Sequence, residues 1–433
     1  MRLPSGFRDF PPDIARIYDA VISRIKYVFE LYGFDPLYTP HLELWNTLKG
    51  KYGEEAEKLL IWRFEDVWSK DWYALRYDHT VPLARHFASA SYPLPFKRYT
   101  VGSVFRHERA QRGRFREFVQ ADADIIGSPY PEADAELVNM VCDIMERLGF
   151  REFKVKISDR RILTGILRSR FGISNELEVF RAIDKLDKIG VDGVKRELRK
   201  VVSEETAEQI LDIVTISGDL NISLKKLESM FSNELTQRGI DHLKAMSRYI
   251  IPRAMRYVEF ALELVRGLDY YTGPVWEVIV EGVGLGSVGG GGRYDELLGI
   301  YTKKNIPATG TSFGVDRLVE AGRELGIYRG KSSPKVYLVC LSGDMYDYAW
   351  RLLYRLRELG VPAEIDLMRR KESKQRQHAR RKNVKILVFI GKREIEHGTL
   401  TIYFDGERVT LKTEEAIRKV RELVAKEFPT SPL

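Results

Sequence analysis

The sequence predicts an α+β fold followed by a smaller α/β domain, and three observations lead to this class. Two runs with large apolar residues flank a short basic connection at 110–114, which is typical of a β-hairpin. Residues 160–255 are dense in charged helical pattern. Beyond residue 334, strand patterns alternate with helical ones. The strand patterns lie at 335–341, 361–367, 384–391 and 399–404, and the helical patterns lie at 345–359, 371–382 and 414–427.

Length and composition place the chain among globular proteins. Its 433 residues, 44% hydrophobic and 30% charged, suffice for two or three domains. The net charge of +8 favours an acidic polymer such as RNA as a partner, although a basic balance alone identifies none. Cys142 and Cys340 form no CxxC pair, which argues against a thiolate zinc site. The start lacks an apolar signal region and no stretch reaches membrane-spanning length, so we expect a cytoplasmic protein.

A helix is predicted over residues 11–32. Pro11 and Pro12 open it, apolar residues follow at helical spacing, and Gly33 comes after the last of them. Residues 33–40 then form a short extended run that ends at a proline. An ordinary helix and strand packed in a monomer also fit this pattern.

The most informative segment is 105–124, expected as a strand at 105–109, a basic tip, and a strand at 115–124. Because side chains alternate along a strand, one face gathers mostly polar and ionisable groups, namely Arg106 and Glu108, then Phe118, Gln120, Asp122 and Asp124. Unpaired charges are costly in a core, so this face lines either a ligand cleft or solvent. We favour a cleft, because an aromatic ring beside an arginine is a stacking platform for a base.

This segment also resembles motif 2 of histidyl-tRNA synthetases, a class II family, in residues 105–109, 112–114 and 115–120. The resemblance implies an antiparallel sheet flanked by helices that binds ATP. It assigns the α-phosphate to Arg106, further nucleotide contacts to Glu108 and Arg114, and the adenine stack to Phe118. The tip residues Gln111 and Arg112 would meet the acceptor end of tRNA.

A second segment, residues 265–273, resembles the signature specific to histidyl-tRNA synthetases. It follows a strand pattern at 258–264. The resemblance implies that Arg266 is catalytic and also contacts histidine, together with Tyr270 and Tyr271. Aromatic rings packed under a turn would explain Tyr270 alone.

The loop at 75–82 resembles the family's loop for the amino group of the substrate, which here gives Asp78 and Thr80. A carboxylate and a hydroxyl suit an ammonium group, which offers only donors. The sequence departs from the family at Tyr77, where a proline is usual. Without the resemblance, an Asp before a helix is typical of an N-cap.

The reaction that the resemblance implies fits these side chains. An imidazole has nitrogens on opposite sides, which Asp124 and Tyr271 can bind, with Gln120 beside them. Activation of a carboxylate by ATP needs no general base but needs positive charge at the α-phosphate. Arg106 and Arg266 supply that charge, with Mg²⁺ on the phosphates and no metal site built from protein side chains.

Two glycine-containing segments follow. Residues 284–289 match G-x-G-x-x-G, but no acidic residue stands about 20 positions later, so we reject a dinucleotide-binding oxidoreductase. Residues 289–295 instead resemble the family's glycine-rich strand, whose glycines would permit close approach to the substrate. Residues 310–318 resemble motif 3, which assigns Arg317 to the other face of adenine.

Domain bounds follow from these segments. We expect a catalytic domain at 1–325 with a helical insertion at about 165–255, a linker at 326–334 and an α/β domain at 335–433. In the family the last domain binds the anticodon. Its basic run at 369–382 offers Arg370, Lys374 and Arg381, which with Gln377 are expected on one helical face.

The resemblance implies a histidine--tRNA ligase that binds L-histidine and tRNA(His) and forms a homodimer through the 11–40 segment, which resembles class II motif 1. Neither a membrane nor DNA is an expected partner. The alternative is a non-catalytic paralogue that regulates histidine biosynthesis. Such paralogues lack the anticodon domain and lose catalytic arginines, both of which this sequence retains.

Overall fold

The computed structural model describes residues 2–52, 57, 59–264, 270–302, 304–328 and 335–427. The chain divides into two compact units, one comprising Met1–Asp9 and Tyr18–Tyr328 and the other Phe10–Ile17 and Arg329–Leu433. None of the helices in the described ranges combines the length and apolar character that crossing a bilayer requires.

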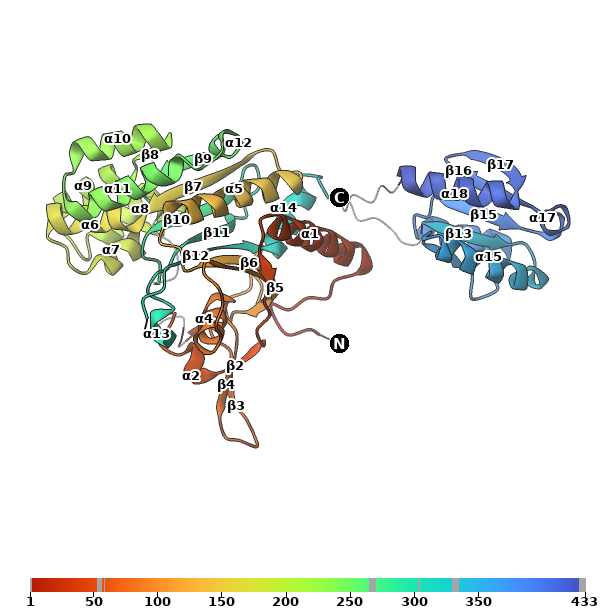
Figure 1. Ribbon diagram of the computed structural model, residues 1–433, viewed down its shortest axis with the longest axis horizontal. Coiled ribbons are helices and arrows are strands. Elements are labelled where there is room, and N and C mark those ends of the chain that lie inside the picture. The colour runs from red at the N-terminus through yellow and green to blue at the C-terminus, as the bar shows by residue number, and fades with distance from the viewer. Residues whose placement is uncertain are drawn as a thin grey trace. The chain divides into compact units, whose positions relative to one another are not determined.

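Unit 1 is built on one large sheet (Figure 1). The strands of this sheet, among the described residues, are β1 (Asp35–Pro36), β5 (Phe96–Phe105), β6 (Glu117–Ile126), β7 (Phe153–Asp159), β8 (Ser217–Gly218), β9 (Val258–Ala261), β10 (Pro274–Val280), β11 (Ser287–Arg293) and β12 (Ala308–Gly314). A separate small sheet contains β2 (Leu42–Leu44), β3 (Arg63–Glu65) and β4 (Trp72–Leu75). The strands of the large sheet lie in the order β1-β5-β6-β12-β11-β10-β7-β9-β8. All neighbours are antiparallel except β1 with β5 and β7 with β9, so the expected α+β class is confirmed.

The helices of unit 1 outside the insertion are α1 (Pro12–Leu31), α2 (Trp45–Leu48), α4 (Thr80–Ser89), α5 (Pro131–Arg147), α13 (Gly299–Thr302) and α14 (Val315–Glu324) among the described residues. The apolar residues at helical spacing in α1 form its buried face, as expected, since Val21, Ile25 and Val28 are fully buried. Helix α5 packs against β12, and α14 packs against β6, β11 and β12.

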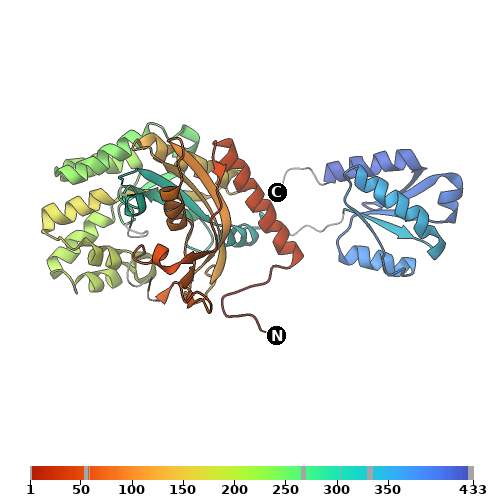
Figure 2. The ribbon, with the colours of Figure 1, turned by 60° about the horizontal axis from the view of Figure 1, so that its bottom comes forward.

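The expected helical insertion is a group of short helices (yellow to green) beside one end of the sheet (Figures 1 and 2). Its members are α6 (Arg160–Phe171), α7 (Glu176–Ile183), α8 (Leu186–Leu198), α9 (Glu204–Val214), α10 (Leu220–Met230), α11 (Glu234–Ser247) and α12 (Pro252–Met255). Helix α11 contacts α5, β7 and β10 as well as α6. The insertion also contacts the sheet through α6, which meets β7, and α10, which meets β8 and β9.

The hairpin differs from the prediction in where its first strand lies. The predicted strand at 105–109 is wrong, because β5 ends at Phe105. Beyond it, the His107 amide donates to the Leu60 carbonyl at 2.8 Å, so the backbone leaves β6 there. Arg106 and Glu108 therefore lie in the connection, where the Arg106 amide still donates to the Arg116 carbonyl at 2.9 Å, and both side chains line the same cavity as β6. The pattern at 258–264 likewise ends early, with β9 finishing at Ala261.

Unit 2 has a five-stranded mixed sheet in the described residues. The strands are β13 (Val336–Cys340), β14 (Ala363–Ile365), β15 (Ile386–Ile390), β16 (Thr399–Phe404) and β17 (Glu407–Lys412). Their order is β14-β13-β15-β16-β17, parallel among the first three and antiparallel afterwards. The helices are α15 (Tyr346–Glu358), α16 (Glu372–Arg381), α17 (Lys392–His397) and α18 (Thr413–Glu427). The sequence patterns missed β17 and α17, because neither buries a side chain fully.

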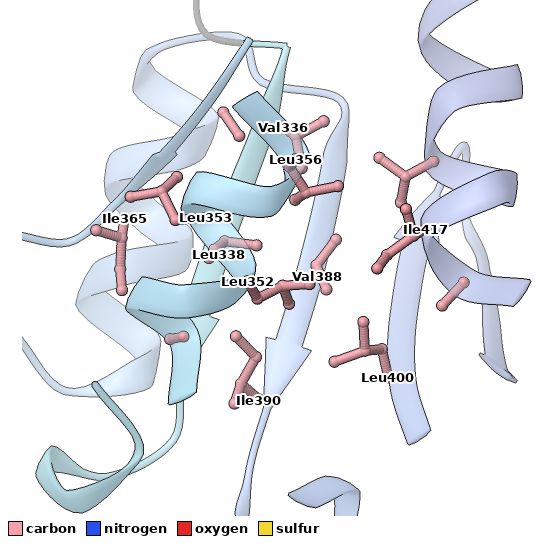
Figure 3. Packing of buried hydrophobic residues seen from close by; sticks show 14 of the residues in the cluster. Val336, Leu338, Leu352, Leu353, Leu356, Ile365, Val388, Ile390, Leu400 and Ile417 are labelled. Carbon is pink, nitrogen blue, oxygen red and sulfur yellow. The ribbon is translucent and has the colours of Figure 1, made fainter. Parts of the chain in front are cut away.

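Helices α15 and α18 pack on one face of this sheet (Figure 3). Leu353 of α15 is fully buried among Leu338, Val388 and other strand residues, and Ile417 of α18 closes the cluster. Parallel strands covered by helices need continuous apolar runs, and β13 and β15 supply them.

We predict that Leu353→Ala lowers the free energy of unfolding of unit 2 by about 2–5 kcal/mol, because it leaves a cavity in this cluster. Amide hydrogen exchange of β13 and β15 in the full chain measures this loss. The matched control is Leu367→Ala, whose side chain is 76% exposed and should cost under about 0.5 kcal/mol. Equal protection in the two variants would contradict the packing described.

Candidate active site

The site is organised by β6, whose side chains alternate as the sequence predicted. Phe118 and Gln120 line one cavity of about 370 Å³, and Gln120, Asp122 and Asp124 line a second of about 160 Å³. Arg106, Gln120 and Ser312 border both cavities. The two spaces therefore adjoin, and a molecule in one can react with a molecule in the other.

Arginines surround the larger cavity. The Arg106 guanidinium carbon lies 5.2 Å from the centre of the Phe118 ring and 4.3 Å from that of Tyr77. Arg114 lies 3.6 Å from the Glu108 carboxylate. Arg317, from α14, donates through Nε to the Gly113 carbonyl at 3.0 Å and also donates to the Ser287 carbonyl.

Electrostatics in this cavity favour an anion. Burial lowers the pKa of Arg317, and the nearby charges of Arg114 and Arg106 lower it further. Three guanidinium groups that face a common space repel each other, and a polyanion placed among them relieves that repulsion. An aromatic ring beside them adds a surface for a base.

The smaller cavity combines carboxylates with phenols. Asp124 is buried, its Oδ2 lies 2.7 Å from Arg98 Nη2, and its Oδ1 accepts a hydrogen bond from Tyr294. Tyr270 and Tyr271 line the same cavity, with ring centres 5.1 Å apart. Burial raises the pKa of Asp124, which the positive charge of Arg98 opposes.

Two glycines make this arrangement sterically feasible. A Cβ on Gly310 of β12 would lie 2.0 Å from Asp124 Oδ1, and one on Gly292 of β11 would lie 2.8 Å from the Tyr271 ring. The glycines of β11 were expected to admit substrate. At Gly292 the chain's own Tyr271 fills the space, whereas Gly289 and Gly290 of the same strand line the larger cavity.

Asp78 makes the helix-capping contact that the sequence left open as one of two roles, and it also lines the smaller cavity. Its Oδ1 accepts from the Val81 amide at 3.1 Å, which caps the start of α4, and from the Tyr52 hydroxyl at 2.9 Å. Its Oδ2 is buried and finds no hydrogen-bond partner in the described part of the chain. Asp78 and Thr80 both line the smaller cavity, so this unpaired oxygen is available to a cationic ligand.

Asp122, to which the sequence assigned no role, is part of the smaller cavity. Its Oδ1 accepts from the Ser312 hydroxyl at 2.6 Å. Burial raises the pKa of Asp122 from 3.8 to about 7, while the charge of Arg98 opposes the rise. The carboxyl group therefore changes its charge near neutral pH.

Some predicted residues lie elsewhere. Arg266 falls within 265–269 and lies outside the described residues. Gln111 and Arg112 occupy the hairpin tip, where Arg112 Nε lies 3.2 Å from Glu320 of α14.

In unit 2, Lys374 and Arg381 are exposed on α16, but Arg370 precedes that helix. Its predicted place on the same helical face is wrong, because Arg370 instead donates to Asp366 at 2.6 Å. This contact holds the residue against the end of β14.

Sequence reasoning missed three residues of the smaller cavity and its surroundings: Arg98, Tyr294 and Tyr52. Arg98 lies on β5 before the expected hairpin, and Tyr52 lies in a stretch without a motif. Tyr294 directly follows the glycine-rich strand, so its position offered a signal. The G-x-G-x-x-G run at 284–289 leads into strand β11 rather than a helix, which agrees with rejecting a dinucleotide site.

No group of three or more His, Cys, Asp or Glu side chains able to hold a metal occurs in the residues that the structure describes. Glu108 and Glu277 both line the larger cavity. Mg²⁺ is commonly bound by one or two carboxylates together with substrate phosphates. This donor set fits such a shared ion.

Comparisons with known proteins agree with this geometry. The family model for histidyl-tRNA synthetase matches residues 6–318, and that for an anticodon binding domain matches residues 335–423. A histidine--tRNA ligase of Aeropyrum pernix is 49% identical over 430 residues, covering 98% of both proteins. One of Korarchaeum cryptofilum is 47% identical over 427 residues, covering 98% of this chain and 99% of its own. The crystal structure of histidyl-tRNA synthetase from Nostoc sp. PCC 7120 superposes with a TM-score of 0.85 at 29% identity, covering 98% of this chain and 99% of that one.

We predict that Asp122→Asn reduces the pH dependence of stability. Because burial raises the folded-state pKa of Asp122 to about 7, its stabilising contribution is complete below pH 3.8 and is lost as the pH rises toward 7. The free energy of unfolding, measured with urea between pH 4.5 and 8, should therefore fall less in Asp122→Asn than in the unaltered chain. The exposed Asp19→Asn serves as control, and parallel curves for all three proteins would refute the assignment.

Proposed function

The chain belongs to the histidyl-tRNA synthetase family, and we propose that it activates L-histidine with ATP and transfers the product to the 3′ end of tRNA(His). The observation that carries this proposal is the junction of the two cavities at Arg106 and Gln120. A histidyl-adenylate joins a nucleotide to an amino acid, and two adjoining cavities, one of which holds an aromatic ring with arginines and the other carboxylates with phenols, suit its two halves.

ATP occupies the larger cavity. Adenine lies between Phe118 and Arg317, since an aromatic face and a guanidinium plane both stack on a base. Glu108 and Arg114 contact the nucleotide, and Arg106 lies where its α-phosphate meets the second cavity.

L-histidine occupies the smaller cavity. The free Oδ2 of Asp78 and the hydroxyl of Thr80 bind its ammonium group, which offers donors only. Asp124 binds one imidazole nitrogen and Tyr271 the other, with Tyr270 and Gln120 completing the wall. A pocket that binds polar atoms of its substrate rejects analogues without them by roughly 10⁴–10⁵.

Activation is a substitution at phosphorus. A carboxylate oxygen of histidine forms a bond to the α-phosphorus, the bond from this phosphorus to the bridging oxygen of the β-phosphate breaks, and its electron pair leaves with pyrophosphate. The carboxylate is already ionised at neutral pH, so no base takes part. Arg106, and by its resemblance Arg266, offset the negative charge that builds up at phosphorus.

Glu108 and Glu277 would hold Mg²⁺ together with the substrate phosphates, and the ion would supply further neutralisation of their negative charge. The carboxylates also keep the arginines of this cavity oriented, as the Glu108–Arg114 pair does. Glu108 and Glu277 thus balance positive charge in the nucleotide cavity and do not bind the amino acid.

The two domains divide the tRNA between them. Residues 1–325, with the insertion at about 165–255, form the catalytic domain, and Gln111 and Arg112 at the hairpin tip meet the acceptor end. Residues 335–433, after the 326–334 linker, form the anticodon-binding domain. There Arg370, Lys374 and Arg381 contact backbone phosphates, which position RNA without reading its sequence. A homodimer formed through α1 and residues 33–40 in the cytoplasm completes the proposal.

A regulatory paralogue without catalysis is the competing function. Arg106, Arg114 and Arg317 all face the nucleotide cavity, and the anticodon-domain match extends over residues 335–423. A regulator of histidine biosynthesis requires neither feature, so the ligase is favoured.

ATP–pyrophosphate exchange with each amino acid in turn tests the function. We expect exchange with histidine at least about 10³-fold above any other amino acid, because the imidazole pairs with buried polar groups. Exchange with several amino acids, or with none, would overturn the proposal.

The two cavities should respond separately to substitution. Asp124→Asn should raise the KM for histidine about tenfold or more and leave the KM for ATP within about threefold, because it loses a charged acceptor. Arg317→Met should do the opposite, because it removes the stacking cation from the nucleotide side. Steady-state exchange kinetics measure both constants, and a matching change of both constants in each variant would contradict the separate assignments.

A further inference from the structure

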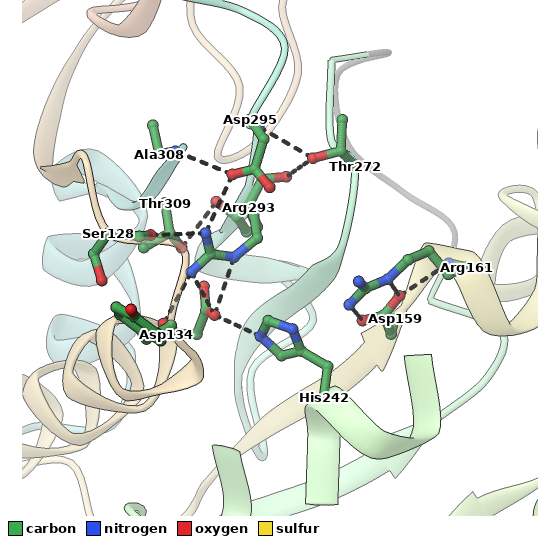
Figure 4. Close-up of polar contacts among 12 residues, drawn as sticks. Ser128, Asp134, Asp159, Arg161, His242, Thr272, Arg293, Asp295, Ala308 and Thr309 are labelled. Atoms are coloured by element: carbon green, nitrogen blue, oxygen red, sulfur yellow. Dashed lines mark hydrogen bonds and ion pairs between the residues drawn. The ribbon is translucent and has the colours of Figure 1, made fainter. Parts of the chain in front are cut away.

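A buried ionic cluster lies next to the smaller cavity without contributing a wall to it (Figure 4). Its centre is Arg293, the last residue of β11, which is 2% exposed. Arg293 Nη2 and Nε lie 2.8 and 3.1 Å from Asp134 Oδ2, and Nη1 lies 3.2 Å from Asp295. Nη1 also donates to the Ser128 carbonyl at 2.9 Å.

The backbone around Arg293 holds two of the tyrosines that line the histidine pocket, Tyr271 and Tyr294. Its carbonyl accepts from the Thr272 amide at 2.8 Å, and the Asp295 amide donates to the Thr272 hydroxyl at 3.1 Å. Thr272 directly follows Tyr271. The residue after Arg293 is Tyr294, whose hydroxyl donates to Asp124. A displacement of Arg293 therefore moves Tyr271 and Tyr294 together.

One contact of this cluster comes from the helical insertion. His242, on α11, lies with Nε2 2.8 Å from Asp134 Oδ2, and its side chain is 12% exposed. Although burial raises the pKa of Asp134, the hydrogen bonds and charges of His242 and Arg293 lower it below its ordinary value. The carboxylate is therefore ionised and holds both partners strongly.

We propose that His242 is a positioning residue for histidine binding, because its hydrogen bond to Asp134 fixes Arg293 and thereby the pocket walls Tyr271 and Tyr294. The proposal rests on the proposed function and extends it. It makes the insertion a part of amino-acid recognition, through a residue that lies outside the pocket.

A merely structural role makes a different prediction. A contact that only stabilised the fold would lower stability without separating the two substrates. The positioning role separates them, since Tyr294 and Tyr271, the neighbour of Thr272, line the histidine cavity. In the described residues the hydrogen bonds of Arg293 and His242 reach none of Phe118, Arg114 and Arg317 of the nucleotide cavity.

The experiment compares three variants of the full chain. His242→Met removes the donor, and His242→Gln keeps an N–H at the end of a side chain of similar reach. Lys244→Met is the matched control, because it removes an exposed partner of Glu228 from the same helix at 2.7 Å. The readouts are the KM for histidine and for ATP in pyrophosphate exchange, and the midpoint of thermal unfolding.

We expect His242→Met to raise the KM for histidine about tenfold with the KM for ATP within about twofold, as small misplacements of binding groups do. His242→Gln should restore the KM for histidine to within about threefold of the unaltered chain, and Lys244→Met should leave it unchanged. An unchanged KM for histidine in His242→Met, or an equal rise of both constants, would overturn the proposal. If His242→Met does not fold, His242→Asn, whose amide is too short to reach Asp134, replaces it.

A second measurement needs no substrate. Amide hydrogen exchange at Thr272 reports the bond to the Arg293 carbonyl, and we expect it to be faster in His242→Met than in Lys244→Met. Equal rates would overturn the link between α11 and the pocket. If the unaltered chain shows no histidine-dependent pyrophosphate exchange, the proposed function fails. The rate of amide hydrogen exchange at Thr272 still decides whether His242 holds the backbone beside the pocket.

Discussion

The polar face of β6 is the constraint on which the rest of unit 1 depends. Phe118, Gln120, Asp122 and Asp124 follow one another at two-residue spacing, so the strand carries a ring, an amide and two acids over about 20 Å. Such a face cannot be buried without partners. Arg98 from β5, Ser312 from β12 and Tyr294 after β11 supply them, and the order of strands in the sheet is what brings these partners alongside.

Charge is divided between the two cavities. The arginines Arg114 and Arg317 line only the larger space, the carboxylates Asp78, Asp122 and Asp124 line only the smaller, and Arg106 stands at the boundary. This division suits a reaction between an anionic nucleotide and an amino acid that carries a positive ammonium group. In the proposed reaction the phosphates face the arginines of the larger cavity, the ammonium group faces the carboxylates of the smaller one, and the reacting atoms meet near Arg106.

The sequence predicted the features that depend on local spacing. Alternation along β6 identified the face that lines both cavities, and the apolar spacing of α1 identified its buried side. Contacts between distant segments were beyond such reasoning, because no local pattern shows that Arg98 and Tyr294 meet on Asp124. The sequence also misplaced the ends of strands that depend on a distant partner. Strand β5 stops at Phe105, and the His107 amide then donates to the Leu60 carbonyl. Arg370 was misplaced for the same reason. Its hydrogen bond to Asp366, and not helical periodicity, sets its position.

The close approach of Gly310 to Asp124 restricts how this pocket can be redesigned. Even a methyl group at position 310 would overlap the carboxylate oxygen, so this position of β12 cannot be used to change the size or polarity of the cavity. Laboratory evolution toward a non-natural amino acid therefore has to vary the tyrosines opposite this strand and retain the glycine. A library that randomises position 310 would consist almost wholly of inactive members.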